Sequence, residues 1–504
     1  MRSPVSNQPY GTKPEALPPE EDGKSLGVWD AASIIVGIVV GTTIFVSPRI
    51  VFAHSSGVWW SILAWVVGGF LAFIGALCYA ELATTYPKTG GDYVYLNRAY
   101  GSLMGFLFGW AQLTVVLPAS IGVMAYAFAI NATSLYDITR IIDIGFDSNF
   151  IYAFGAVTLV ALLNLIGVVV GKLAQNILSV LKILALVAII VVGFGWSEPN
   201  QEAWKTFETN GWPWGALAMI FTLYAYGGWN DAAFVASEVK NPERNIPKAL
   251  FWGVGIITLL YVLVNVAYVF GLGWDEVRKH QWFPAFDPLP SLLVEKAAGG
   301  WGGKAMNILV MISALGAVNG LTFAGSRVYA SLGNDHPIFI WLGRWKAGRG
   351  APVLAIFFQA VITLAMVYVF GTAVGKAFVN TNVVDPLNSM QIVKDWNIEL
   401  KADWDPKGAF EALVSTSAPV FWVFFLLAGL SVYVLRIRDA NRPRPFRAPW
   451  FAPAIFSVMC GYMLYEAAKF ASWNSLLFVI VVLIGIPLYL LDWVFGYRGQ
   501  SAED

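Results

Sequence analysis

Two long apolar segments of this chain are interrupted by glycine near their middles, at residues 37–45 and 224–230. A break in a helix leaves backbone N–H and C=O groups without intrahelical partners. Lipid cannot satisfy these groups, so a break at membrane depth must line a cavity inside the protein. The helix that follows a break begins with partial positive charge and suits a carboxylate, whereas the carbonyl groups that end the preceding helix suit an ammonium. The two breaks together are therefore predicted to hold a small zwitterion.

The residues predicted to contact this ligand lie at the two breaks. A simpler alternative is that the glycines only allow helices to pack closely, as small residues often do in membranes. Breaks in two corresponding segments, the first and the sixth, favour the binding interpretation. The contact residues at the breaks are Gly41, Thr42, Thr43, Ile44, Ala225, Tyr226, Gly227 and Asn230.

Two charged residues inside apolar segments are candidates for coupling. Lys182 follows Lys172 by ten residues, which places it about 15 Å into its helix. Its side chain cannot easily reach water from there, so the ammonium needs a partner or must lose its proton. Asp231 directly follows the second break. It either stabilises a helix N-terminus or lies near the ligand, where it would favour an amine or take up a proton.

The composition predicts an α-helical membrane protein that crosses the bilayer many times. Hydrophobic residues make up 57% of the chain and charged residues only 13%, a balance that no soluble core requires. A helix needs about 20 apolar residues to cross the hydrocarbon layer. The predicted spans are 30–52, 57–80, 99–130, 150–170, 173–196, 214–237, 249–273, 304–331, 351–371, 411–436, 451–470 and 475–496.

The basic residues orient these spans. The densest cluster lies between the tenth and eleventh spans, and an even number of spans with a cytoplasmic N-terminus places this cluster in the cytoplasm. Both termini are then cytoplasmic, and the polar, Pro-rich start of the chain is a disordered tail without a signal sequence. The arginines of the cluster are Arg436, Arg438, Arg442, Arg444 and Arg447.

The sequence lacks the residues that several other classes of function require. The net charge is zero, so nothing suggests a nucleic-acid partner. The three histidines lie in or near predicted loops, so no cluster of metal-binding side chains is predicted. Neither a phosphate-binding loop nor a plausible catalytic triad is present, so no enzyme and no cofactor are expected. The two cysteines, Cys78 and Cys460, lie in apolar spans and predict no disulfide.

Motifs along the chain carry a resemblance to a known family. Residues 224–230, Tyr-Ala-Tyr-Gly-Gly-Trp-Asn, and residues 237–247, Ser-Glu-Val-Lys-Asn-Pro-Glu-Arg-Asn-Ile-Pro, resemble the sixth helix and following loop of L-type amino acid transporters. This family belongs to the amino acid-polyamine-organocation superfamily. Further matches lie at 78–82, 88–93, 174–182, 316–320 and 442–447.

The resemblance implies a fold and a domain plan. The fold is the five-plus-five inverted repeat of leucine transporters with two additional helices at the end, which makes the protein all-α. The first repeat covers 27–200, and the second covers 201–371 and 411–436. An outer loop at 372–410, longer than in the family, is either a lid or an insertion. Residues 450–496 hold the last two spans, and residues 1–26 and 497–504 are cytoplasmic tails.

The resemblance also assigns roles to single residues. Val115 and Val116 match positions that line the substrate pocket, and Tyr224 matches an aromatic gate. Thr43 replaces a glycine of the family motif Gly-Ser-Gly-Ile-Phe, which narrows the site and disfavours positive φ. Lys182 resembles a built-in substitute for the sodium ion of sodium-coupled relatives, although a polar packing position without a coupling role is the alternative.

The expected function is a sodium-independent amino acid permease or antiporter that works by alternating access in the inner or plasma membrane. Some relatives pair through a disulfide with a heavy subunit, but the loop 131–150 lacks cysteine, so no such partner is expected. A proton-coupled transporter of amines, polyamines or cationic amino acids remains an alternative. A channel or a non-transporting amino acid sensor remains another.

Overall fold

The computed structural model describes residues 28, 32, 36, 39–87, 90–141, 145–166, 168–196, 214–230, 240–279, 288–343, 352–395, 400–471 and 474–501. Every regular element within these ranges is helical, apart from one isolated bridge between Ser55 and Trp214. Nine helical stretches in the described part are long and apolar enough to cross a membrane, and Thr43–Ala53 and Val180–Gly195 are shorter apolar helices. The all-α membrane fold is confirmed, whereas the count of twelve spans stays a prediction.

The helices match the predicted spans closely. For the second to fifth spans they are α3 (Val58–Thr85), α5 (Ser102–Ala111) continued by α6 (Leu117–Leu135), α7 (Ser148–Ile166) and α8 (Val168–Gly195). For the later spans they are α10 (Pro242–Leu272), α12 (Leu289–Asp335), α13 (Val353–Gly371), α17 (Ala409–Arg438), α18 (Phe451–Ala471), α19 (Asn474–Leu483) and α20 (Gly485–Ser501).

The helix α12 begins earlier than the predicted eighth span. Its first turns form a separate segment that meets the span at Gly299, where φ is 73°. Glycine adopts this backbone conformation without the steric cost that other residues meet. The prediction from hydropathy started at residue 304 because the preceding residues are polar and glycine-rich.

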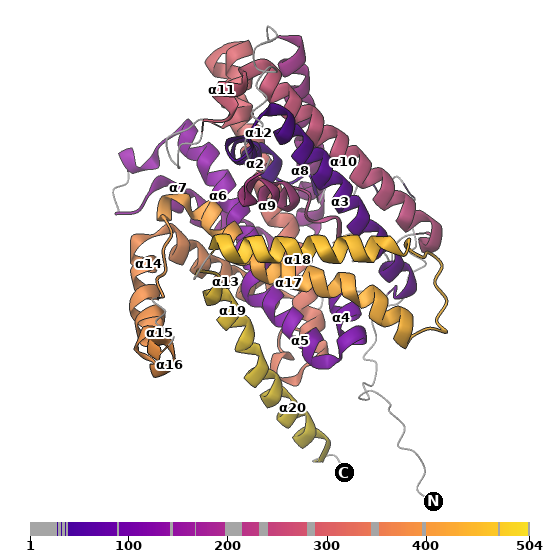
Figure 1. Ribbon diagram of the computed structural model, residues 1–504. Coiled ribbons are helices and arrows are strands. Elements are labelled where there is room, and N and C mark those ends of the chain that lie inside the picture. Colours follow the sequence, from indigo (N-terminus) through magenta and orange to yellow (C-terminus); the bar gives the residue numbers. More distant parts are fainter. Residues whose placement is uncertain are drawn as a thin grey trace, which may run out of the picture.

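Helical winding stops beside a glycine in two predicted spans. In the first, Val39 is still helical, residues 40–42 are not, and α2 (Thr43–Ala53) follows. In the sixth, α9 (Ala216–Ala225) ends in a turn at 226–228, where Gly228 has a φ of 101°. The helices α2 and α9 pack against each other in the middle of the molecule (Figure 1).

The third span changes its winding in the middle. A π-helical turn, η1 (Gln112–Val116), separates α5 from α6. Such turns free a backbone carbonyl and often occur at functional sites. Here the Tyr329 hydroxyl of α12 donates to the Gln112 carbonyl over 3.1 Å. The helix α17 packs against both α6 and α3, and it contains Pro419 in its interior.

The predicted outer loop, 372–410, is folded where it is described. It contains α14 (Ala373–Val379), the π-helical η6 (Asn380–Val384), α15 (Asp385–Ser389), α16 (Gln391–Asp395) and the 3-10 turn η7 (Pro406–Gly408). The helices α14 to α16 extend along the left edge of the molecule beside α13 (Figure 1). The residues of the predicted N-terminal tail lie outside the described part of the chain, as do 502–504.

Candidate functional site

The two helix breaks meet at a single hydroxyl group. Tyr261 of α10 is fully buried, and its hydroxyl lies 3.0 Å from the Val39 carbonyl oxygen and 3.1 Å from the Ala225 carbonyl oxygen. These carbonyls belong to the last helical residues before the two breaks. The Val39 oxygen also accepts the Gly41 backbone N–H over 2.6 Å. Because the single hydroxyl proton of Tyr261 serves one carbonyl at a time, the pair of oxygens keeps acceptor capacity for a further donor, most of it on Ala225. The backbone ends thus converge as the sequence predicted.

The start of α2 supplies the opposite charge preference. The backbone N–H of Phe45 donates to the Thr42 carbonyl over 3.0 Å, so Thr43 and Ile44 occupy the first turn. The first N–H groups of a helix have no intrahelical acceptor. The Thr42 hydroxyl is buried without a hydrogen-bond partner among the described residues. The site therefore offers donors at α2 close to acceptors at Val39.

Thr43 fits its position without the strain that the sequence suggested. It is the first residue of α2, and among the described residues other than glycine only Asn241 has a positive φ. The side chain of Thr43 is buried. The expected conflict between a branched side chain and positive φ therefore does not arise at this residue.

The glycines at the breaks are not tightly packed against another helix. A Cβ placed on Gly41 would have the Val39 carbonyl oxygen, at 3.7 Å, as its nearest described atom. On Gly227 the nearest is the Tyr224 carbonyl oxygen of the same turn, at 3.1 Å. By contrast, a Cβ on Gly68 of α3 would lie 2.5 Å from Thr222 of α9. Close helix packing thus explains Gly68 and does not explain Gly41.

A small pocket lies beside the sixth-span break, between the third, sixth and tenth spans. It combines Val116 and Tyr224, two residues predicted to contact the substrate, with Ser120 of α6. The cavity volume is about 10 Å³, close to what one water molecule needs. The other lining residues are Ile220, Ser417, Ala418, Phe421 and Trp422. Val115 is fully buried in η1 but is not part of this lining.

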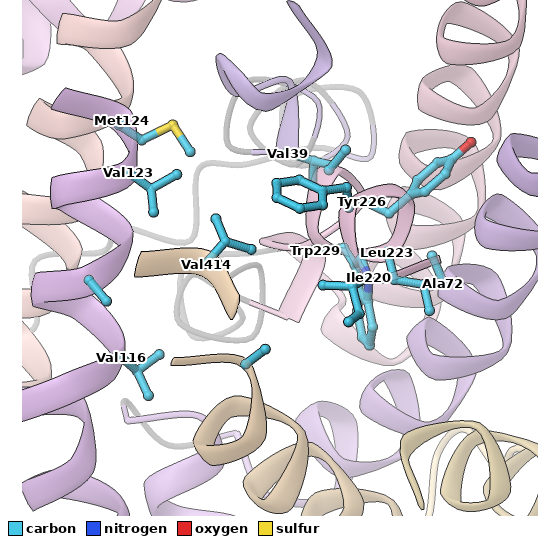
Figure 2. Close-up of a cluster of buried hydrophobic side chains, with 14 of the residues drawn as sticks. Val39, Ala72, Val116, Val123, Met124, Ile220, Leu223, Tyr226, Trp229 and Val414 are labelled. Atoms are coloured by element: carbon cyan, nitrogen blue, oxygen red, sulfur yellow. The ribbon is translucent and has the colours of Figure 1, made fainter. Parts of the chain in front are cut away.

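The apolar side chains around the pocket come from the same three helices. Figure 2 shows Val116, Val123 and Met124 on one side, Ile220, Leu223 and Tyr226 on the other, and Val414 of α17 between them. The Tyr226 hydroxyl points away from α6 and donates to the Trp65 carbonyl of α3 over 2.8 Å. The side chain of Tyr226 therefore anchors α9 to α3, and only its backbone belongs to the break.

Of the two residues predicted to act in coupling, the structure describes Lys182 but not Asp231. Lys182 is 1% exposed, so its burial inside α8 agrees with the sequence argument. The helix α8 packs against α12 and α10. Asp231 lies outside the described residues. Asn230 is half-buried at the end of the sixth-span break.

Asp92 is a carboxyl group near the site that the sequence did not single out. It begins α4 (Asp92–Tyr100), the short helix between the second and third spans, and it is buried. Its neighbours are the polar side chains of Tyr79 and Asn230, and its Oδ1 has no hydrogen-bond partner within the described part. Burial raises the pKa of Asp92 to about 7, against smaller opposing effects of these two neighbours. The charged form is costly there because water is excluded.

Arginine side chains bond to carboxylates near the connection between α17 and α18. Glu81 of α3 accepts hydrogen bonds from both Arg436 of α17 and the backbone N–H of Ala448. Nearby, Arg98 donates two hydrogen bonds of 3.0 and 2.9 Å to the Asp439 carboxylate. These bonds from Arg98 lower the pKa of Asp439 to about 2. No group of three or more His, Cys, Asp or Glu within the described ranges could hold a metal ion.

Comparisons with known proteins identify the family of this chain. Residues 26–486 match the family model "Amino acid permease". The chain is 28% identical over 520 residues to "Large neutral amino acids transporter small subunit 2" of Homo sapiens, covering 98% of this chain and 86% of that protein. It is 26% identical over 492 residues to "Serine/threonine exchanger SteT" of Bacillus subtilis (strain 168), covering 96% of this chain and 99% of that protein.

The fold comparison gives the same architecture. A solved structure titled "Inward facing conformation of Mhp1" superposes with a TM-score of 0.54 at 14% identity, covering 91% of each chain. The expected leucine-transporter-like fold is thereby confirmed. The named relatives are transporters and the matched family is a permease family rather than an enzyme family. The chain is a multi-pass membrane protein that belongs to the amino acid permease family.

Proposed function

We propose that this protein is a sodium-independent amino acid transporter, a permease or an antiporter, that binds its zwitterionic substrate at the two helix breaks. The carboxylate is held by the N–H groups at the start of α2 and by the Thr42 hydroxyl. The ammonium is held by carbonyl groups at the ends of the two preceding helices. The position of Tyr261 between Val39 and Ala225 carries this proposal, since it shows the two carbonyl ends side by side.

The substrate side chain occupies the pocket between the third, sixth and tenth spans. Val116 and Ile220 offer apolar contact, while Ser120, Ser417 and the Tyr224 hydroxyl offer hydrogen bonds. A pocket with room for about one water molecule must widen before an amino acid enters. Alternating access supplies this change, because movement of α2 and α9 relative to α6 and α17 opens the pocket to one side at a time.

Lys182 acts in place of a coupling cation. Its ammonium, buried in the fifth span, provides a fixed positive charge where sodium-coupled transporters would bind an ion. Coupling to protons through Lys182 and Asp231 is the alternative, and it would suit an amine, a polyamine or a cationic amino acid as substrate.

The protein works without a disulfide-linked subunit in the inner or plasma membrane, with both termini in the cytoplasm. The name of the human relative describes that protein as a small subunit. In this chain both cysteines, Cys78 and Cys460, are buried in helices, so neither is placed to bond another chain. The arginine-rich end at 436–447 is the cytoplasmic end.

Uptake into proteoliposomes tests the proposal. We expect saturable uptake of a radiolabelled neutral amino acid with equal rates in sodium and in choline buffer. Acceleration by an internal amino acid indicates exchange, and acceleration by an inward proton gradient indicates the proton-coupled alternative. Flux that does not saturate would indicate a channel, and binding without flux would indicate a sensor; either outcome would refute the proposal.

A further inference from the structure

A second pocket lies at the arginine-rich end of the molecule, where α17 continues into the connection to α18. It has a volume of about 350 Å³. Three of its lining residues are arginines, Arg98, Arg438 and Arg442, and one is an aspartate, Asp439. Ala440 and Asn441 complete the lining. The pocket is therefore polar, open and positively charged.

The single carboxylate of the pocket, that of Asp439, already accepts hydrogen bonds from two side chains. Arg98 donates from Nε and Nη2 to the two oxygens of Asp439, and the Tyr86 hydroxyl donates to Oδ2 over 2.7 Å. Among the described residues, neither Arg438 nor Arg442 forms an ion pair with a carboxylate. Within the described part of the protein, these two arginines thus have no direct ion-pair partner, although Arg442 lies close enough to Asp439 to help lower the pKa of that carboxyl group.

Both unpaired arginines are nevertheless held in place by the protein. Arg438 Nη1 donates to the Arg98 carbonyl over 3.2 Å. Arg442 Nε donates to the Thr85 carbonyl over 3.0 Å, and its guanidinium lies 4.5 Å from the centre of the Tyr86 ring. These contacts use one nitrogen of each guanidinium, so the remaining N–H groups stay available to a ligand. A positioned guanidinium loses little freedom when it binds an oxyanion.

The surroundings of the pocket are those of a membrane surface. Ile437, beside Arg438, is 81% exposed, and Trp450 at the start of α18 is 79% exposed. The Tyr433 hydroxyl of α17 donates to the Trp450 carbonyl, which fixes this tryptophan next to α17. Large apolar side chains and tryptophan at such an end mark the boundary between acyl chains and head groups. The connection lies at the right edge of Figure 1.

We propose that this pocket binds the phosphate group of an anionic phospholipid, with Arg438 and Arg442 as its ligands. Guanidinium groups present paired N–H donors that match phosphate oxygens. Ile437 and Trp450 lie against the acyl chains of the same lipid. Arg436 and Arg444 take no part, because both lie against the buried Glu81 carboxylate. The site lies on the lipid surface of the transporter, apart from the substrate site.

Binding of phosphatidylglycerol to the purified protein in detergent tests the proposal, with native mass spectrometry and thermal unfolding as readouts. We expect phosphatidylglycerol to bind and to raise the melting temperature, and phosphatidylcholine to do neither. The variant Arg438→Gln should weaken phosphatidylglycerol binding about tenfold or more, the loss expected for a charge-assisted contact. Arg442→Lys keeps the positive charge but loses the paired N–H donors of the guanidinium. This variant should weaken phosphatidylglycerol binding to a smaller extent.

Arg447→Gln is the matched control, because Arg447 is an exposed arginine of the same connection outside the pocket lining. It should leave binding unchanged. An equal loss in Arg447→Gln and Arg438→Gln would overturn the site, since the attraction would then be general. Inorganic phosphate that stabilises the wild type as well as the lipid does would overturn the lipid as the ligand. Unaltered binding in Arg438→Gln, with the same melting temperature in detergent alone, would overturn the proposal as a whole.

Discussion

Glu81 and Arg436 form a buried, two-pronged ion pair between the second and tenth spans, with Arg436 Nε donating to Glu81 Oε1 over 2.8 Å. The side chain of Glu81 is 1% exposed, and that of Arg436 is 11% exposed. The Ala448 backbone N–H also donates to Glu81, over 2.8 Å. This carboxylate therefore fixes the connection after α17 to α3.

The first prediction concerns this pair. Glu81→Gln should destabilise the protein by about 3–5 kcal/mol, because removing one partner leaves a buried charge uncompensated. Chemical unfolding in detergent, followed by tryptophan fluorescence, measures the change. Glu295→Gln, at an exposed glutamate of α12, should stay within about 0.5 kcal/mol of wild type. A similar, small effect of both substitutions would show that the pair contributes little.

The second prediction concerns pH and Asp92. Since burial raises the pKa of Asp92 in the folded protein to about 7, above the ordinary value of an aspartate, the folded state favours the protonated carboxyl. Its stabilising contribution is fully present below the pKa of the unfolded chain and is lost as the pH rises through about 7. The melting temperature should therefore fall as the pH rises from about 4 to about 7 and should level off above that.

Asp92→Asn provides the comparison. Asparagine is neutral at every pH, so this part of the pH dependence should disappear in the variant. A wild-type melting temperature that is constant between about pH 4 and pH 7, or a variant that keeps the full dependence, would contradict the assignment to Asp92.

The third prediction concerns Tyr261. Tyr261→Phe removes the hydroxyl shared by the Val39 and Ala225 carbonyls and leaves these buried acceptors without that donor. We expect a loss of about 1–3 kcal/mol in stability and a higher KM for transport, because the two breaks are no longer held together. Tyr268→Phe on the same helix is the control, since the buried Tyr268 hydroxyl has no hydrogen-bond partner among the described residues. Equal KM values for the two variants would argue against a role of Tyr261 in positioning the site.

The fourth prediction concerns the outer loop. The Asn380 side chain both donates to and accepts from the backbone of Ala402, over 3.2 and 3.1 Å, and Asn388 does the same for Leu400. Asn380→Ala should accelerate amide hydrogen exchange at 400–404 because it removes this pairing. The side chain of Asn382 donates to the Phe378 carbonyl one turn earlier and makes no hydrogen bond to 400–404 within the described residues, so Asn382→Ala provides the control. Unchanged exchange in Asn380→Ala would show that the loop is held by other contacts, such as Trp404 stacked on Phe370.

The breaks and the pocket differ in how far the sequence reveals them. Gly41 and Gly227 interrupt runs that are otherwise apolar, and this local pattern is sufficient to predict a break. Val116 and Tyr224 were predicted through the family resemblance, and the fold brings both to one pocket. Their proximity depends on the packing of the third span against the sixth and tenth, which no local pattern encodes.

Tyr261 and Asp92 could not be singled out from the sequence. Nothing in the local sequence around a tyrosine in an apolar helix indicates which group its hydroxyl will bond. The Tyr261 hydroxyl donates to the carbonyl of Val39, which lies 222 positions away along the chain. Asp92 follows two glycines in what reads as a polar connection, and only the packing around Tyr79 and Asn230 buries it. Arg436 was correctly grouped with a basic cluster, but its pairing with Glu81 required the fold.

The most direct test of the central claim is equilibrium binding of one neutral amino acid, its methyl ester and its deaminated acid to the purified protein. If the helix breaks hold both charged ends, each analogue should bind about 10-fold to 100-fold more weakly than the amino acid, the loss expected for charge-assisted hydrogen bonds. Binding of either analogue within about threefold of the amino acid would contradict the claim that both ends are recognised.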